Sequence, residues 1–214
     1  ADYARQGARG ALAQVARALT DVFVFDGQVV PSRQRRHGRP VGDLPRSRFV
    51  GYTQTHDQVG NRARGERLCH LVPDGLARAA AALVLTGPCV PMLFAGEEWA
   101  AGSPFQYFTS HPDADLAAAV GEGRRREFAG FHLAHPELDV PDPQEPTTFL
   151  RSKLRWEELA DDRHAWMLEW YRSLIELRRT DPALRDDRPE ATVVQVDEQG
   201  RWLHVARGTT LVIA

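Results

Sequence analysis

Two residues that can do chemistry, His56 and Asp57, close an apolar run that begins at Phe49. The aromatic and β-branched residues of this run predict a buried strand. In a parallel (β/α)8 barrel the reactive side chains lie at the carboxyl ends of the strands, so a carboxylate at this point fits a catalytic role. An ordinary turn fits the same pair, with Asp57 capping the next segment and His56 packed and hydrogen-bonded.

A second apolar run, residues 89–95, also ends in polar residues: Gly96, Glu97, Glu98 and Trp99. Residues 74–86 are rich in Ala and Leu, begin with Asp74 and are followed by Gly87 and Pro88, which predicts a helix. A helix between two buried strands returns the chain to the same direction, so the polar ends of both strands meet at one edge. This order indicates the repeating unit of a parallel barrel.

The remaining pattern predicts two more helices and two irregular stretches. Apolar spacing predicts helices over residues 10–19 and 164–179, with Trp166 and Trp170 of the latter in the core. Residues 26–48 are basic and turn-prone, which is typical of a surface loop or of a loop over a site. Residues 100–149 predict an extended loop with one short helix around 124–131. Its aromatic residues could stack on sugar rings or fill a core: Phe105, Tyr107, Phe108, Phe128 and Phe131.

The end of the chain alternates apolar and polar residues around Gly200 and Gly208. This pattern predicts antiparallel strands over residues 191–196, 201–206 and 209–213. We therefore expect an α/β chain, with residues 1–182 as part of a (β/α)8 barrel and residues 183–214 as the start of a small β domain. The chain lacks an initiating Met and ends in apolar residues, so we expect it to come from a longer protein.

Composition limits the partners of the chain. A formal net charge of -2 and a pI near 6.5 give no global field that would attract nucleic acid or an anionic membrane. Cys69 and Cys89 lack the spacing of a disulfide framework, no apolar run reaches about 18 residues, and the start of the chain lacks a signal-peptide core. We expect a cytoplasmic protein without nucleic-acid or membrane partners.

A metal-dependent hydrolase is an alternative, since the chain holds several possible ligands: His37, His56, Asp57, His70, His111, His132 and His135. His132 and His135 are three residues apart and could share a helix face. No His-Glu-x-x-His string is present, however, and Pro136 would stop that helix. The spacing therefore disfavours a metal site, and no cofactor is expected.

Several strings, taken in their order, resemble the alpha-amylase superfamily of glycoside hydrolases. His56 and Asp57, followed by residues 91–98, are similar to the late barrel motifs of that superfamily, which implies the C-terminal part of the barrel. Within the superfamily, further strings are similar to the malto-oligosyltrehalose trehalohydrolases: residues 35–40, 56–62, 96–99, 104–108, 123–128, 140–144 and 152–154. The likeness covers most of the chain.

This resemblance implies hydrolysis, with retention, of the α-1,4 bond next to the terminal trehalose of a malto-oligosaccharide. Asp57 would be an ionised carboxylate that stabilises the distorted, oxocarbenium-like sugar ring, and His56 would hydrogen-bond the same sugar. Glu98 would support the site rather than transfer a proton. The substrate-binding residues implied with His56 are Gln58, Asn61, Arg62, Glu98, Trp99 and Phe105.

The chain departs from the family pattern in two ways. Thr55 replaces an expected Asn, which is a small change. More importantly, a retaining glycosidase needs a nucleophile and a general acid about 5 Å apart, and in this superfamily both come from middle strands of the barrel. No string here matches those motifs, so we expect the 214-residue chain alone to have no useful hydrolase activity.

Two further functions stay open. A glycogen branching or debranching enzyme shares the barrel and the strand-end pair, which cannot tell whether water or a sugar hydroxyl attacks the covalent intermediate. The strings at residues 35–40 and 140–153 favour the trehalose-releasing enzyme by resemblance. A non-catalytic, amylase-like carbohydrate-binding protein would keep the barrel but lack the catalytic acids. An aspartate and a glutamate at the ends of two earlier strands would exclude this function.

Overall fold

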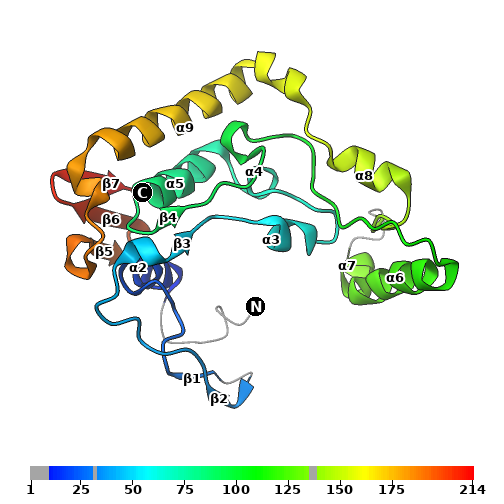
Figure 1. The fold of residues 1–214 in the computed structure, drawn as a ribbon, viewed down its shortest axis with the longest axis horizontal. Coiled ribbons are helices and arrows are strands. Elements are labelled where there is room, and N and C mark those ends of the chain that lie inside the picture. The colour runs from blue at the N-terminus through cyan, green and yellow to red at the C-terminus, as the bar shows by residue number, and fades with distance from the viewer. Residues whose placement is uncertain (1–9, 31–32, 135–138) are drawn as a thin grey trace. The chain divides into compact units, whose positions relative to one another are not determined.

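The computed structural model describes residues 10–30, 33–134 and 139–214 (Figure 1). The helices are α2 Ala11–Asp21, α3 His56–Gly60, α4 Leu68–Leu71, α5 Asp74–Leu85, α6 Ala114–Glu127, α7 Ala129–Ala134, α8 Pro146–Ser152 and α9 Asp162–Thr180. The strands are β1 Val29–Val30, β2 Arg35–Arg36, β3 Val50–Gly51, β4 Val90–Pro91, β5 Val193–Asp197, β6 Trp202–Arg207 and β7 Thr210–Ile213. Short 3-10 helices are η2 Arg46–Arg48, η3 Glu97–Trp99, η4 Trp156–Ala160, η5 Pro182–Arg185 and η6 Pro189–Ala191.

The chain divides into two compact units. Unit 1 is formed by Ala1–Tyr52, Ala79–Met92 and Arg172–Ala214, and unit 2 by Thr53–Arg78 and Leu93–Tyr171. The expected boundary between residues 182 and 183 does not follow this division, since residues 172–214 group with the first 52 residues. That boundary therefore stays a prediction.

Unit 1 contains the parallel strand pair that the sequence predicts. Strand β3 pairs with β4 in parallel, with Val50 opposite Val90 and Gly51 opposite Pro91. Helix α5 lies between the two strands in the chain, as expected. Both strands are shorter than the apolar runs around them, because Pro91 has no N–H to donate and the chain leaves the ladder after the bond from Met92 N to Gly51 O.

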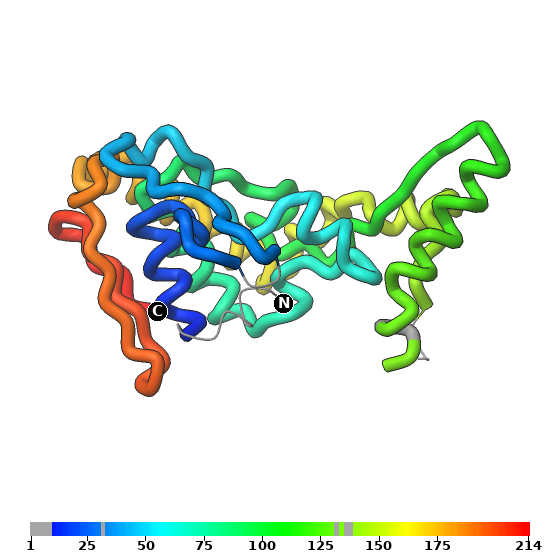
Figure 2. Tube along the Cα trace, turned by 90° about the horizontal axis from the view of Figure 1, so that it is seen from below, coloured from blue at the N-terminus to red at the C-terminus, as the bar shows by residue number. Residues whose placement is uncertain are grey.

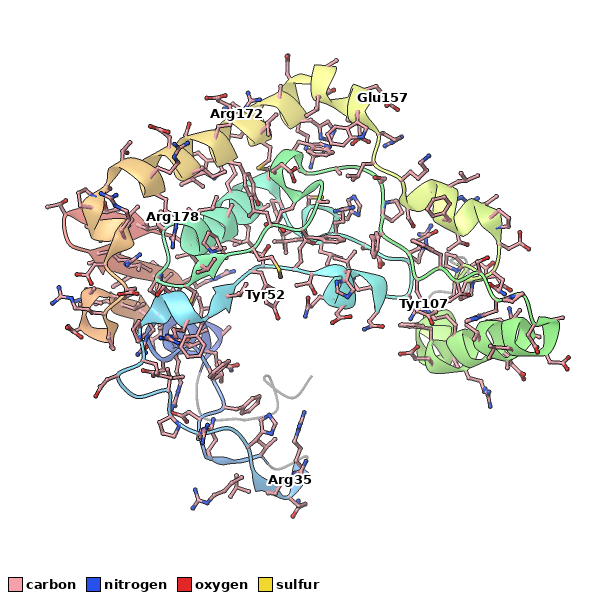
Figure 3. The ribbon with its side chains drawn as sticks, viewed as in Figure 1. Arg35, Tyr52, Tyr107, Glu157, Arg172 and Arg178 are labelled. Carbon is pink, nitrogen blue, oxygen red and sulfur yellow. The ribbon has the colours of Figure 1, made fainter. Side chains whose placement is uncertain are left out.

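Two arginines, the half-buried Arg178 and the buried Arg207, secure the turn between α5 and β4 within unit 1. Arg178 donates to the carbonyl oxygens of Leu85, Gly87 and Cys89, and Figure 3 labels its side chain on α9. Arg207 donates to Thr86 O and Gly87 O at 3.0 Å and to Leu184 O at 3.2 Å. These bonds satisfy carbonyl groups that the end of a helix leaves without partners. Burial lowers the pKa of both guanidinium groups.

The C-terminal strands form an antiparallel sheet in the order β5-β6-β7, which confirms the strands predicted there. Leu203 and Val205 of β6 are buried, and α2 packs against β5 and β6 (Figure 2). Helix α2 agrees with the helix predicted over residues 10–19.

Residues 26–48 contain an antiparallel pair where we expected a loop. Val29 lies opposite Arg36 and Val30 opposite Arg35, whose side chain is exposed (Figure 3). The sequence did not predict these strands because its basic residues indicate a loop and because a strand of two residues is too short to show an alternating pattern.

The expectation of one short helix in residues 100–149 is wrong. Helices α6, α7 and α8 all lie there, and α6 is capped by Asp113, whose side chain accepts from Leu116 N at 2.9 Å. Gly121 and Gly123 interrupt the apolar pattern of α6. A Cβ at position 121 would lie 3.2 Å from Asp142 Oδ2, so this glycine serves packing rather than a turn.

Helix α9 is found where the sequence predicts it, but the expected burial of Trp166 is wrong. Trp166 is 52% exposed, and the guanidinium of Arg78 lies 3.9 Å from its ring centroid. A cation on the ring face holds the aromatic side chain at the surface. No helix in the described ranges is long and apolar enough to cross a membrane.

Candidate active-site segment

Helix α3 carries the His-Asp pair in its first turn. Its N-cap is Thr55, whose Oγ1 accepts from Asp57 N at 3.2 Å, and the Gln58 side chain accepts from Thr55 N at 2.8 Å. This reciprocal arrangement is a capping box. Thr55 and not Asp57 therefore caps the segment, which removes the capping role from Asp57 and leaves its carboxylate available.

Both side chains of the pair are open to solvent. His56 Nε2 lies 3.2 Å from Asp57 Oδ1, and each side chain is 71% exposed. A polar contact this exposed adds little stability. The two groups can therefore contact a ligand without first losing a structural interaction.

The other predicted substrate-binding residues of this region lie on or beside α3. Gln58 and Asn61 are exposed, and Arg62 Nε lies 3.4 Å from Glu66 Oε2. A Cβ at Gly60 would lie 3.8 Å from the ring of Phe105, so this half-buried ring packs against α3. The structure thus brings these residues together on α3, on the turn after it and on the aromatic ring that packs against it.

Two other predicted residues follow β4 and have structural partners. Glu98 is half-buried and its Oε2 accepts from Gly96 N at 2.9 Å. Trp99 is only 2% exposed and its ring centroid lies 4.9 Å from that of Trp156. A ring buried this deeply offers no face to a sugar, so the substrate-binding role expected of Trp99 is corrected to packing.

Glu97, which the sequence did not single out, is the buried carboxylate of this region. Gly96, with φ of 89°, turns the chain in the left-handed region that favours glycine and places Glu97 at 7% exposure. Oε1 accepts from Thr53 Oγ1 at 3.1 Å and from Tyr171 at 3.0 Å. Oε2 accepts from Gln54 Nε2 at 3.2 Å and from Phe94 N at 3.3 Å.

Burial raises the pKa of Glu97, and the hydrogen bonds from Gln54, Tyr171, Phe94 and Thr53 oppose that rise. Burial and the neighbouring carboxylate also raise the pKa of the Tyr171 phenol. Adjacent glutamates after a strand were the available sequence signal. The sequence cannot tell which one faces inward, because that depends on the turn at Gly96.

Arg124 of α6 is a second buried group beside α3. It is 7% exposed and donates to Gly60 O at 2.7 Å and to Arg62 O at 2.8 Å. Its guanidinium lies 5.2 Å from the ring centroid of Tyr107, which is labelled in Figure 3. Tyr107 is 42% exposed, so its ring is partly open to a ligand.

Curated relatives of the chain carry one name. A malto-oligosyltrehalose trehalohydrolase of Rhizobium sp. (strain M-11) is 46% identical over 204 residues, which cover 94% of this chain and 34% of that protein. The protein of the same name from Mycobacterium tuberculosis is 43% identical over 205 residues, covering 95% of this chain and 35% of the relative. Over nearly its whole length the chain is therefore similar to the malto-oligosyltrehalose trehalohydrolases. It spans about a third of the length of these relatives.

The chain is also similar to a solved structure. A protein from Salmonella typhimurium, provisionally named an alpha amylase, matches with a TM-score of 0.83 and 36% identity over 96% of this chain and 34% of that chain. No protein-family model matches the chain. The sequence resemblance to the trehalohydrolases is therefore confirmed by relatives and by a structure of an amylase-type protein.

The histidines weighed as metal ligands do not gather in the part of the chain that the structure describes. No group of three or more His, Cys, Asp or Glu side chains suited to a metal ion occurs among the described residues. His70 instead accepts from Arg67 N through Nδ1 at 3.1 Å, and burial lowers its pKa. His135 and Pro136 lie outside the described residues.

Proposed function

We propose that this chain is part of a malto-oligosyltrehalose trehalohydrolase, which hydrolyses the α-1,4 bond beside a terminal trehalose and releases trehalose with retention. The observation that carries the proposal is the exposed His56 and Asp57 pair in the first turn of α3, the helix that follows the parallel strand β3 in the chain. The names of relatives that match nearly the whole chain support the substrate class.

The finer fold belongs to the same proposal. Residues 1–182 would form the C-terminal part of a (β/α)8 barrel, and residues 183–214 the start of an antiparallel β domain. The parallel β3 and β4, the helix between them, and the separate three-stranded sheet support it. The two free thiols, Cys69 and Cys89, suit a cytoplasmic setting.

Asp57 would act on the transition state. Positive charge develops on the sugar ring as the bond breaks, and a carboxylate held beside the ring stabilises that charge more than it stabilises the ground state. His56 would donate to or accept from a hydroxyl of the same sugar. Gln58, Asn61, Arg62 and Phe105 would line the same subsite, with Glu98 behind it, while the nucleophile and the general acid would come from the rest of the longer enzyme.

A branching or debranching enzyme would use the same His56 and Asp57 pair. A transferase of this kind differs from the trehalohydrolase in the molecule that accepts the sugar, which is a sugar hydroxyl instead of water. Relatives at 41–46% identity that share the trehalohydrolase name favour water as the acceptor. A non-catalytic protein would lack the two upstream carboxylates. The reaction products of the whole enzyme therefore separate all three functions.

The test is a product assay on the whole enzyme with malto-oligosyltrehalose. We expect free trehalose, and we expect Asp57→Asn to lower kcat by at least about 100-fold, the usual cost of losing one electrostatic stabiliser. The exposed Asp115→Asn on α6 is the matched control and should leave kcat unchanged. Transfer of sugar to another glucan, or a normal rate in Asp57→Asn, would contradict the proposal. The 214-residue chain alone should release no trehalose.

A further inference from the structure

Both carboxylate oxygens of Glu97 accept hydrogen bonds from neighbouring residues. Each oxygen accepts two bonds, from Thr53 and Tyr171 on one side and from Gln54 and Phe94 N on the other. Four polar groups therefore surround the carboxylate within hydrogen-bond distance. A group so occupied cannot also take part in proton transfer with a sugar, so its role must be exerted through the residues that it binds.

Two of those residues lead directly into α3. Thr53 and Gln54 precede the N-cap Thr55, and both side chains donate to Glu97. Gln54 is 5% exposed and uses its other end as well, since its Oε1 accepts from Leu68 N at 2.9 Å. The chain just before His56 and Asp57 is therefore fixed by side chains at two consecutive positions.

The carboxylate is itself held in place. Tyr171, 4% exposed, approaches from α9, and Arg67 secures the turn that carries Glu97 by donating to Ala95 O and Ser103 O, each at 2.8 Å. Arg67 is 1% exposed. Because the anchoring groups are buried, water cannot replace their bonds at low cost.

Arg124 fixes the opposite end of α3. Its bonds to Gly60 O and Arg62 O hold the last residue of the helix and the turn after it. A helix of five residues has too few bonds of its own to hold a direction, so tertiary contacts must supply it.

We propose that Glu97 is a positioning residue that, together with Arg124, fixes both ends of α3 and so orients Asp57 and His56 toward the sugar. The catalytic effect of this positioning rests on the proposed function, in which Asp57 and His56 bind the sugar. A displacement of about 1 Å in a catalytic group can cost about 100-fold in rate, which makes such fixation necessary.

The first test is Glu97→Gln in the whole enzyme. The amide is uncharged, so the bonds from Gln54 Nε2 and Phe94 N to its oxygen lose their charge assistance, and its NH2 group must donate to the hydroxyls of Thr53 and Tyr171 instead of accepting from them. We expect kcat to fall by about 10- to 100-fold with KM within about three-fold of wild type, because orientation rather than sugar binding is affected. Amide hydrogen exchange at Val59 and Asn61, measured without substrate, should become faster.

Glu158→Gln is the matched control. Glu158 also lies in unit 2 and accepts from Gly102 N at 3.0 Å, but none of its bonds reaches residues 53–62. We expect wild-type kcat and wild-type exchange in α3. Tyr171→Phe removes one of the four bonds and should lower kcat by about 3- to 10-fold, and it keeps the test possible if Glu97→Gln does not fold.

The outcomes separate the two proposals. If the wild-type enzyme releases no trehalose, the proposed function fails, and the exchange data alone still decide whether Glu97 fixes α3. Unchanged exchange or unchanged kcat in Glu97→Gln would overturn the positioning role. An equal loss of kcat in Glu158→Gln would overturn it as well, since the effect would then be a general loss of structure.

Discussion

Tyr171 donates a hydrogen bond of 3.0 Å to Glu97, although 74 residues separate them in the chain. This bond joins α9 to the turn after β4 inside unit 2. The segments that follow β3 and β4 meet at the same carboxylate, because Thr53 and Gln54 bind it too. The sequence predicts that the ends of these two strands lie close together, and Glu97 is the residue whose hydrogen bonds connect them.

Tyr171 should resist ionisation. Burial and the nearby Glu97 carboxylate raise the pKa of its phenol, so the folded state keeps the proton more firmly than the unfolded state does. Its contribution to stability is present below the ordinary pKa near 10 and is lost as the pH rises above that value. In an ultraviolet titration of the folded enzyme, Tyr171→Phe should leave the phenol signal near pH 10 unchanged. A smaller signal in the variant would show that Tyr171 titrates normally.

Asp74 should stabilise the fold in a pH-dependent way. Arg163 donates to both of its carboxylate oxygens, at 2.7 and 2.8 Å, and lowers its pKa. A depressed folded pKa gives stability that is present above the ordinary value near 3.8 and is lost as the pH falls through the folded pKa. Asp74→Asn should therefore melt below wild type at pH 7, and the difference should shrink below pH 4. A difference that persists in acid would exclude the ion pair as its cause.

Arg207→Met should destabilise unit 1 by about 3 kcal/mol, because the carbonyl groups of Thr86 and Leu184 lose this donor while Gly87 keeps only Arg178. Arg207 is 1% exposed and serves Thr86, Gly87 and Leu184. The exposed Arg126→Met is the control and should change the urea midpoint little. Equal midpoints for the two variants would show that other groups satisfy those carbonyls.

The two glycines of α6 should respond differently to alanine. Nothing lies within 4 Å of a Cβ at Gly123, so Gly123→Ala should stabilise by about 0.5–1 kcal/mol through helix propensity. At Gly121 the new Cβ would lie 3.2 Å from Asp142, which must move. Gly121→Ala should therefore be the less stable variant in thermal melts, and the reverse order would refute this packing.

The elements with strong local signals were predictable. Helices α5 and α9 were expected within two residues of their bounds because each has a regular apolar face and clear end signals. Only one short helix, around residues 124–131, was predicted where α6 and α7 lie, and α8 was not predicted, because Gly121, Gly123 and scattered prolines hide the periodicity. The sequence also predicted a substrate-binding Trp99 and a buried Trp166, whereas Trp99 is buried and Trp166 is exposed. Each outcome depends on a neighbour distant in sequence, Trp156 and Arg78.

The sequence by itself carried the likeness to the trehalohydrolases, the parallel order of the two strands and the position of His56 and Asp57 after the first of them. These are local properties, carried by residue type and spacing. Only the tertiary structure decided that Glu97 rather than Glu98 is the buried carboxylate and that Arg124 holds the far end of the helix. Such choices depend on contacts between segments dozens of residues apart, which no local pattern encodes.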